Sequence, residues 1–484
     1  MSLRTRAAIA AFKALSAPTA SSFRTALTRP AAAQQQLLVE LCDGLKRTDR
    51  GRELGVTGPG DFFDKVPIVG WEELQPWADR QRAEEGRVLV ADPVVVYEKT
   101  SGSTGASKYI PYTRALQWSF TRMFLIWVRD MAMNGPKWRT ARMYFSISPN
   151  LDTPETTSKG VSVGLEDDSE YLQGWVGTMF RPYLVMPKVG HLRDPNEWRR
   201  ALARELAGQR DLEVISVWNP SFLTVLLDTM DELGVKPVWP ELKLISCWDE
   251  GHAAPVAEQL RQRFPDVVIQ GKGLLATEAP LTVPLLGIGP VPLLDEVYFE
   301  LLDDDGRSHA LHEAADGAEY SLVISQKAGL LRYRIGDRVR VSGWCGPTPC
   351  LSFAGRGSQV CDLVGEKLNA RFVGAAVDKV LPGAAIRTLI PIREPAGYVL
   401  LVDEGGEDLA AALERELLAA HHYKVARLLE QLQPVRVCHR SDAAEQLLAF
   451  HERLGMARGN VKPSVLLTRP ADDELRRVLS TPLP

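Results

Sequence analysis

The stretch from Tyr97 to Tyr112 (YEKTSGSTGASKYIPY) gathers hydroxyl side chains, two glycines and a lysine. Hydroxyl and loop N–H groups bind phosphate oxygens, glycines let the backbone approach closely, and a lysine neutralises charge. A Walker A loop requires Gly before its Lys and Ser or Thr after it, whereas Lys108 lies between Ser107 and Tyr109. The stretch therefore predicts a phosphate loop of a different kind. Its candidate residues are Thr100, Ser101, Gly102, Ser103, Thr104, Gly105 and Lys108.

The flanking residues predict a strand before this loop and a helix after it. Asp92–Tyr97 (DPVVVY) has the composition of a short buried strand, and Thr113–Met133 is predicted as a helix. A strand, a small-residue loop and a helix together form a common support for phosphates. The alternative interpretation is an ordinary Gly/Ser/Thr-rich surface loop.

A second candidate segment is Gln270–Ala279 (QGKGLLATEA), which centres on Ala276, Thr277 and Glu278. A hydroxyl beside a carboxylate suits a triphosphate bound with Mg²⁺, with Thr277 at the α-phosphate and Glu278 at the metal. Mg²⁺ is usually held by one or two carboxylates plus phosphate oxygens, so one glutamate is chemically sufficient. The alternative is a Thr-Glu pair on the surface.

Two more segments contain polar residues that could contact a nucleotide. In Tyr333–Asp337 (YRIGD), a buried Asp337 at a strand end could accept hydrogen bonds from both ribose hydroxyls. In Gly355–Ser358 (GRGS), Arg356 could reach ribose or phosphate. The alternatives are a β-turn capped by the aspartate and an interdomain turn with a solvated arginine.

The order T-S-G-S-T-G-x-x-K resembles the signature loop of adenylate-forming enzymes. With the following Tyr-Ile-Pro-Tyr, the stretch is most similar to the auxin-responsive (Gretchen-Hagen-type) acyl-acid amido synthetases of plants and their bacterial relatives. We expect the chain to belong to the bacterial branch. Three other segments also resemble this family and follow its order: Ile245–Gly251, Gly365–Leu368 and Gly459–Pro463.

The resemblance implies an ATP-dependent, AMP-forming ligase. A carboxylic acid would form an acyl-adenylate, pyrophosphate would leave, and the acyl group would pass to an amine or amino acid to form an amide. The implied cofactors are ATP and Mg²⁺, with Glu278 as the metal ligand. The implied catalytic residues are Lys108, Thr277, Glu278 and Lys462. The implied nucleotide-binding residues are the loop residues 100–105, Lys108, Glu250, Gly251, Ala276, Thr277, Tyr333, Asp337, Arg356 and Lys367.

Two other functions remain open on sequence grounds. The first is a ligase that transfers the acyl group to coenzyme A or another thiol, and the second is a non-catalytic sensor of a nucleotide or an acyl acid. The residues do not identify the acid or the amine. Trp175, Phe180 and Tyr183 lie in a Gly-rich segment that could line an apolar pocket or simply pack in the core.

The bulk properties are those of a globular chain of more than one domain. The chain has 484 residues, 24% of them charged and 45% hydrophobic, and a net charge of −4. This charge gives no reason to expect a nucleic-acid or membrane partner. The six cysteines are scattered without zinc-site spacing, which favours free thiols in a reducing compartment. We therefore expect a cytoplasmic monomer whose partners are small-molecule acid and amine substrates.

The predicted fold class is α/β. Strands and helices alternate from Asp194 to Gln270, which predicts βαβ units around a mostly parallel sheet, and from Asp295 the pattern becomes antiparallel. We expect a large ATP- and acyl-acid-binding domain at 1–357 and a small, mobile α+β lid domain at 358–484. The Ala-rich N-terminal segment, whose first acidic residue is Glu40, is expected to be helical, with a transit peptide as the alternative.

Overall fold

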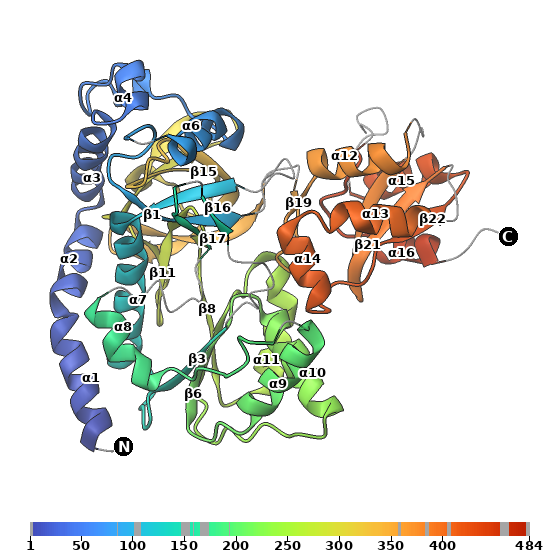
Figure 1. The fold of residues 1–484 in the computed structure, drawn as a ribbon, viewed down its shortest axis with the longest axis horizontal. Helices are drawn as coiled ribbons and strands as arrows, with labels where there is room; N and C mark the ends of the chain where they lie inside the picture. The colour runs from blue at the N-terminus through green and yellow to red at the C-terminus, as the bar shows by residue number, and fades with distance from the viewer. Residues whose placement is uncertain are drawn as a thin grey trace. The chain divides into compact units, whose positions relative to one another are not determined.

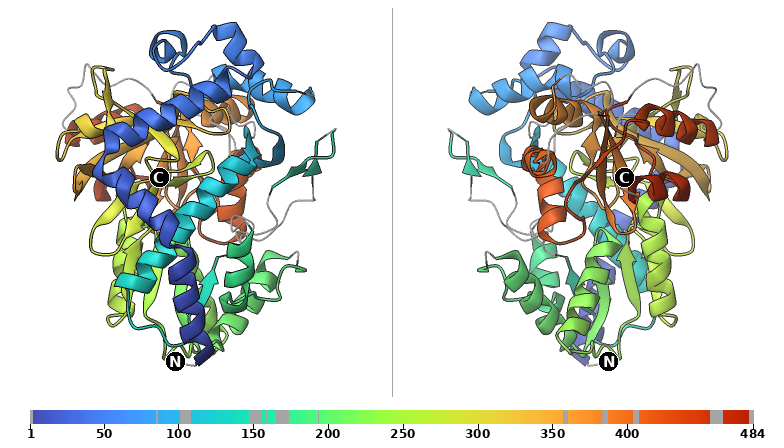
Figure 2. Two further views of the ribbon diagram at one scale, coloured as in Figure 1. Left: turned by 90° about the vertical axis from the view of Figure 1, so that its left-hand side faces the viewer. Right: turned by 90° about the vertical axis from the view of Figure 1, so that its right-hand side faces the viewer.

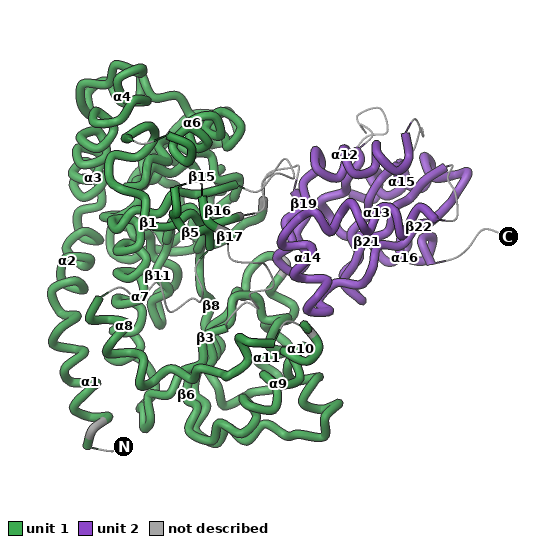
Figure 3. Tube along the Cα trace, viewed as in Figure 1, with its two compact units in different colours: residues 1–100, 108–355 green, residues 101–107, 356–484 purple. Residues whose placement is uncertain are grey.

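The computed structural model describes residues 3–84, 86–100, 108–146, 155–157, 159–164, 174–192, 194–356, 360–382, 387–403, 408–454 and 464–480. The chain forms two compact units (Figure 3), an N-terminal unit of residues 1–100 and 108–355 and a C-terminal unit that begins at residue 356. This division lies close to the boundary predicted after residue 357.

The N-terminal segment consists of three consecutive helices, α1 (Leu3–Leu15), α2 (Ala17–Thr28) and α3 (Pro30–Leu45). They follow one side of the N-terminal unit and pass α7 (Arg114–Asn134), as Figures 1 and 2 show. Phe12 and Phe23 are buried in the main core together with apolar side chains of α7. The segment is therefore a packed part of the fold, which agrees with the helical expectation.

A four-stranded parallel sheet in the order β3-β6-β7-β8 lies in the lower half of the N-terminal unit in Figure 1. Helices α9, α10 and α11 connect and cover it. Asp194 and Asn219 cap α9 and α10 by accepting backbone N–H groups, and a proline follows each cap. The bounds are β3 Arg142–Phe145, β6 Leu212–Ser216, β7 Leu244–Cys247, β8 Val268–Gly271, α9 Pro195–Ala207, α10 Pro220–Glu232 and α11 Ala254–Arg263.

The second large sheet of this unit has five strands in the order β14-β13-β15-β16-β17, and the pairs β13–β14, β13–β15 and β15–β16 are antiparallel. The sequence predicted antiparallel pairing from Asp295 onward, and this sheet agrees with that prediction, although after β8 antiparallel pairing already begins at Leu275 in a hairpin. The bounds are β13 Val297–Leu302, β14 Ser308–Ala310, β15 Glu319–Gln326, β16 Tyr333–Cys345 and β17 Thr348–Arg356.

Smaller elements join these two sheets. A third sheet has the order β2-β1-β5-β4, and two hairpins, β9–β10 and β11–β12, follow β8. The bounds are β1 Val94–Thr100, β2 Lys108–Thr113, β4 Glu155–Thr156, β5 Ser162–Val163, β9 Leu275–Ala276, β10 Ala279–Pro280, β11 Thr282–Leu285, β12 Gly289–Pro292, α4 Asp49–Leu54, α5 Phe62–Lys65, α6 Trp71–Ala83 and α8 Trp175–Phe180.

The C-terminal unit is an α+β module with its own core. Its sheet has the order β20-β21-β22, in which β20 and β21 are antiparallel and β22 runs parallel to β21. Buried leucines and valines of these strands pack against Phe372, Leu413 and Tyr423. The bounds are β18 Val360–Cys361, β19 Leu368–Asn369, α12 Ala370–Val380, β20 Arg387–Arg393, β21 Ala396–Val402, α13 Leu409–Leu417, α14 His421–Leu428, β22 Arg436–His439, α15 Ala443–Arg453 and α16 Asp473–Ser480.

The described residues also bear on membrane crossing and on the state of the cysteines. No helix among them combines the length and the apolar character that crossing a membrane would require. All six cysteines are free thiols, and five of them are buried.

Candidate active site

The predicted phosphate loop connects two paired strands. β1 and β2 are antiparallel, and Thr100 pairs with Lys108 where the loop leaves and rejoins the sheet. Lys108 is therefore the first residue of a strand, where the sequence had suggested a loop residue. The loop residues Ser101, Gly102, Ser103, Thr104 and Gly105 lie outside the described residues, and so does the side chain of Thr100.

The side chain of Lys108 meets two other predicted site residues. Its Nζ donates a hydrogen bond of 2.9 Å to the Tyr333 hydroxyl and lies 3.6 Å from Oε1 of Glu278. The Tyr333 hydroxyl is 3.5 Å from the same carboxylate oxygen. The side chains of Lys108 and Glu278 are only 11% and 9% exposed. A cation, a carboxylate and a phenol that are distant in sequence thus converge in a nearly buried cluster.

The third member of the predicted motif, Thr277, lies beside this cluster at the tip of a hairpin. Ala276 pairs with Ala279, so Thr277 and Glu278 form the two-residue turn between β9 and β10. The Tyr112 hydroxyl donates a 2.6 Å hydrogen bond to the Thr277 carbonyl, and Nε2 of Gln326 donates a 3.1 Å bond to the Glu278 carbonyl. Both backbone carbonyls of the turn thus accept a hydrogen bond from a neighbouring side chain, and these bonds help to fix the conformation of the turn.

The surroundings strengthen electrostatic interactions at this cluster. The Lys108 ammonium lies 5.8 Å from the centre of the Trp71 ring and 5.7 Å from that of the Tyr333 ring. Aromatic faces attract a cation, and they exclude water that would otherwise screen its charge. A phosphate oxygen that approached Lys108 here would be stabilised more strongly than in bulk water.

Asp337 lies in an irregular part of β16. Ser321 of β15 pairs with Arg338 and Val323 pairs with Arg334, so β16 has extra residues between these two pairs. Gly336 in this bulge has a φ of +91°, a backbone conformation that favours glycine. Bulges redirect side chains and often occur next to active sites. The G-D part of the YRIGD motif therefore sets the direction of Asp337, whose side chain is buried.

Glu250 and Gly251 follow β7 and contact β17. Oε2 of Glu250 accepts a 2.5 Å hydrogen bond from the N–H of Phe353. Burial raises the pKa of Glu250 to about 7, so that this carboxyl binds a proton far more readily than a solvated glutamate. Gly251 has a φ of +56°, and a Cβ there would lie 3.1 Å from the Phe353 ring. A side chain at residue 251 would be strained by this φ, and its Cβ would press tightly against the Phe353 ring.

Three further predicted residues belong to the C-terminal unit. Arg356 ends β17, and its side chain lies outside the described residues. Lys367 precedes β19 in the C-terminal unit, with a φ of +50°. Lys462 lies outside the described residues.

Sequence reasoning missed Tyr112, Gln326 and Trp71 as parts of the cluster. Tyr112 was recognised only as the end of the resembling motif, although its alternation with Ile110 along β2 is a signal of two inward-facing side chains. Gln326 and Trp71 carry no local signal, because each reaches the site through the packing of distant elements.

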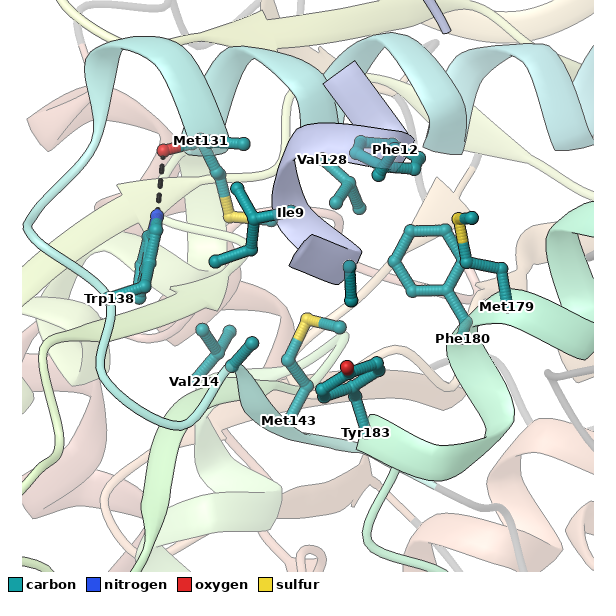
Figure 4. A pocket seen from close by; sticks show the side chains of 13 residues that line it. Ile9, Phe12, Val128, Met131, Trp138, Met143, Met179, Phe180, Tyr183 and Val214 are labelled. Atoms are coloured by element: carbon teal, nitrogen blue, oxygen red, sulfur yellow. Dashed lines mark hydrogen bonds between the residues drawn. The ribbon is translucent and has the colours of Figure 1, made fainter. Parts of the chain in front are cut away.

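An apolar cavity lies beside the parallel sheet (Figure 4). Its volume is about 70 Å³, and α1, α7, α8, β3 and β6 contribute to its wall. Phe180 and Tyr183 line it, as do Phe12, Met131 and Met143, and Trp138 is fixed by a 2.9 Å hydrogen bond to the Met131 carbonyl. Two of the three aromatic residues singled out in the sequence thus line a small void, whereas Trp175 is not among its lining residues. None of the residues of the Lys108 cluster lines it.

Comparisons with known proteins agree with these observations. The GH3 family N-terminal domain matches residues 19–236 and the GH3 family central domain matches residues 291–356, together more than half of the chain. Indole-3-acetic acid-amido synthetase GH3.10 of Arabidopsis thaliana is 22% identical over 78% of this chain and 80% of its own length. The 4-substituted benzoates-glutamate ligase GH3.12 of the same plant is 23% identical over 66% and 68%.

Two solved structures share the fold. The AtGH3.15 acyl acid amido synthetase superposes with a TM-score of 0.65 over 96% of this chain and 95% of its own, at 17% identity. A 2-hydroxyisobutyryl-CoA ligase superposes with a TM-score of 0.57 over 89% and 94%, at 16% identity. These matches confirm the predicted fold class, with a large N-terminal and a smaller C-terminal domain.

Proposed function

We propose that this chain, which belongs to the GH3 family, is an ATP-dependent ligase that activates a carboxylic acid as an acyl-adenylate and transfers the acyl group to an amine or amino acid. The observation that carries the proposal is the nearly buried cluster of Lys108, Tyr333 and Glu278 beside Thr277. Family membership supports the reaction class, because the curated relatives are named as amido synthetases and ligases.

In the first half-reaction, a carboxylate oxygen of the acid attacks the α-phosphorus of ATP and the bond to pyrophosphate breaks. Negative charge then grows on the phosphoryl oxygens. The Lys108 ammonium, the Thr277 hydroxyl and the N–H groups of the loop between β1 and β2 would stabilise this charge. Catalysis of this kind consists of positioning and electrostatic stabilisation.

Glu278 is suited to hold Mg²⁺ together with phosphate oxygens, because its carboxylate lies beside the proposed phosphate position and Mg²⁺ prefers such oxygen ligands. When bound, Mg²⁺ would neutralise charge on the departing pyrophosphate. We assign the ribose to Asp337 and the adenine to the segment that contains Glu250 and Gly251. Arg356 and Lys367 are proposed as further nucleotide contacts.

In the second half-reaction, the amine nitrogen attacks the acyl carbon, AMP leaves with one oxygen of the original carboxylate, and the nitrogen loses a proton. We propose that residues 1–357 bind ATP and the acid and that the small C-terminal domain, residues 358–484, acts as a mobile lid that supplies Lys462. We also propose that the protein acts as a cytoplasmic monomer, with no nucleic-acid or membrane partner. Its net charge of −4 supports the last point.

The acceptor distinguishes the main alternatives. A CoA ligase shares the fold, so the fold alone does not select an amine over a thiol. The test supplies ATP, an acid panel and either hydroxylamine or CoA, and measures pyrophosphate release, hydroxamate and acyl-CoA. Acid-dependent hydroxamate without acyl-CoA supports the ligase proposed here. Efficient acyl-CoA formation would favour the thioester alternative, and nucleotide binding without turnover of any acid would favour a sensor.

A further inference from the structure

The carboxyl ends of the parallel strands present a row of polar side chains that the proposed mechanism does not use. Ser216, Ser246 and Gln270 are register partners on β6, β7 and β8, so their side chains lie on one face of the sheet. All three are buried. Buried polar groups are costly in a sheet that only needs to pack, and ligands of open α/β sheets bind at this edge.

Lys272 directly follows β8 and joins this row. Its side chain is only 8% exposed, and its Nζ donates a 2.6 Å hydrogen bond to Oγ of Ser216. The ammonium also lies 4.4 Å from the centre of the Trp218 ring and 5.4 Å from that of Trp127. A positive charge is thus held between two aromatic faces at the ligand-binding edge of the sheet.

The aromatic walls beside this charge are fixed in place. Nε1 of Trp127 donates a 2.9 Å hydrogen bond to Oε1 of Gln270, whose own Nε2 donates to the Pro284 carbonyl at 3.0 Å. The Phe145 ring lies 6.1 Å from the Trp127 ring. Flat, rigid walls of this kind suit a planar ligand. The Lys272 ammonium would bind a hydrogen-bond acceptor or an anionic group of that ligand.

Helix α7 connects this region to the proposed adenylation site. Tyr112, whose hydroxyl holds the Thr277 carbonyl, stacks on Phe120 of α7 at 5.6 Å. Trp127 lies two turns further along the helix, a rise of roughly 10 Å at about 1.5 Å per residue. Phe120 and Trp127 thus link the proposed adenylation site and the Lys272 region through one helix.

We propose that Lys272 is a specificity-determining residue of the acid pocket. It would select planar carboxylic acids that carry a second acceptor group, a hydroxyl or carboxylate, at the end far from the reacting carboxylate. This inference rests on the proposed function and names its acid class. An acid without the second group would leave the ammonium desolvated and without that acceptor, and sites built around a buried polar group reject such analogues strongly.

The test uses matched aromatic acids, the para-methyl and para-hydroxyl forms of benzoate, phenylacetate and cinnamate, with wild type and Lys272→Met. Binding is followed without ATP through tryptophan fluorescence, and turnover through pyrophosphate release. In wild type we expect the hydroxyl form of the best-fitting skeleton to bind at least 10-fold more tightly than the methyl form. Lys272→Met should abolish or invert this preference and leave the KM for ATP unchanged.

Lys379→Met is the matched control, because Lys379 is exposed in the C-terminal unit, where it pairs with Glu416. Ser216→Ala keeps the charge of Lys272 but removes its hydrogen-bond acceptor, so we expect it to reduce the preference partially. This second variant keeps the inference testable if Lys272→Met does not fold.

The outcomes distinguish a failure of the Lys272 role from a failure of the proposed ligase function. Equal preference for the hydroxyl form in wild type and Lys272→Met would overturn the role of Lys272, as would a raised KM for ATP with unchanged acid selectivity. If wild type releases no pyrophosphate with any acid but still shows Lys272-dependent acid binding, the proposed function fails and the acid site stands.

Discussion

Replacement of Lys108 by methionine should abolish most adenylation in a protein that is less stable but still folds. Methionine fills a similar volume and removes only the charge and its hydrogen bonds. The attraction between Nζ and the Glu278 carboxylate at 3.6 Å is on the order of 4–5 kcal/mol at an effective dielectric constant of about 20. The substitution leaves the nearly buried Glu278 carboxylate without this partner, so the free energy of unfolding should fall by about 3–5 kcal/mol.

The rate of adenylation should fall even when the variant protein is fully folded. Removing one donor that stabilises charge in a transition state typically costs about 10²–10³ in kcat. We therefore expect Lys108→Met to lower acid-dependent pyrophosphate release by at least about 100-fold. Tyr333→Phe keeps the charge of Lys108 but removes the hydroxyl that accepts a hydrogen bond from its ammonium, and should cost about tenfold. Urea unfolding and pyrophosphate release are measured on both variants, and Lys108→Met turnover within tenfold of wild type would refute the assignment.

Two further predictions concern the Glu250–Gly251 segment. The folded-state pKa of Glu250, raised from 4.5 to about 7, means that the stability contributed by its protonated form is fully present below pH 4.5 and is lost as the pH rises to about 7. Glu250→Gln should remove this loss, so that between pH 4.5 and 8 the free energy of unfolding should fall by on the order of 2–3 kcal/mol more in the wild type than in the variant. The same pH dependence of the urea-unfolding free energy in both proteins would contradict this prediction. Gly251→Ala should cost about 1 kcal/mol more than Gly234→Ala, because both glycines have positive φ but only Gly251 faces Phe353. Equal losses in the two alanine variants would show that the contact with Phe353 is unimportant.

The parallel sheet was predictable because its pattern is local. For example, β6 is a buried, mostly apolar run that leads into α10, whose start is marked by the capping residue Asn219 and the following Pro220. The antiparallel region was harder to delimit. β16 begins at Tyr333 and continues through the motif, although the glycine at residue 336 looks like a strand end in the sequence; it is part of a bulge.

A similar local ambiguity affected the C-terminal unit. The sequence from Asp408 to about His421 predicts a single helix, whereas α13 ends at Leu417 and α14 begins at His421, after Ala420 with a ψ of 116°. The change of direction lets the Tyr423 hydroxyl donate a 2.9 Å hydrogen bond to Glu414. Such a contact depends on tertiary packing and has no sequence signal.

The candidate site was predictable in its charged residues but not in their supports. Lys108, Glu278 and Tyr333 were identified from motifs, and the structure brings them together. The Tyr112 hydroxyl binds the Thr277 carbonyl from more than a hundred positions away in the sequence. Gln326 binds the Glu278 carbonyl from nearly fifty positions away. Only the folded chain reveals such pairs.

The most direct test of the account is an isotope-transfer measurement. An acid identified by the panel is labelled with ¹⁸O in its carboxylate and is incubated with ATP, Mg²⁺ and an amine acceptor, and the products are analysed by mass spectrometry. Adenylation predicts AMP that carries one ¹⁸O atom, because the carboxylate oxygen that attacked the α-phosphorus leaves with AMP. Unlabelled AMP, or ADP formed together with ¹⁸O-labelled phosphate, would contradict the acyl-adenylate and with it the proposed function.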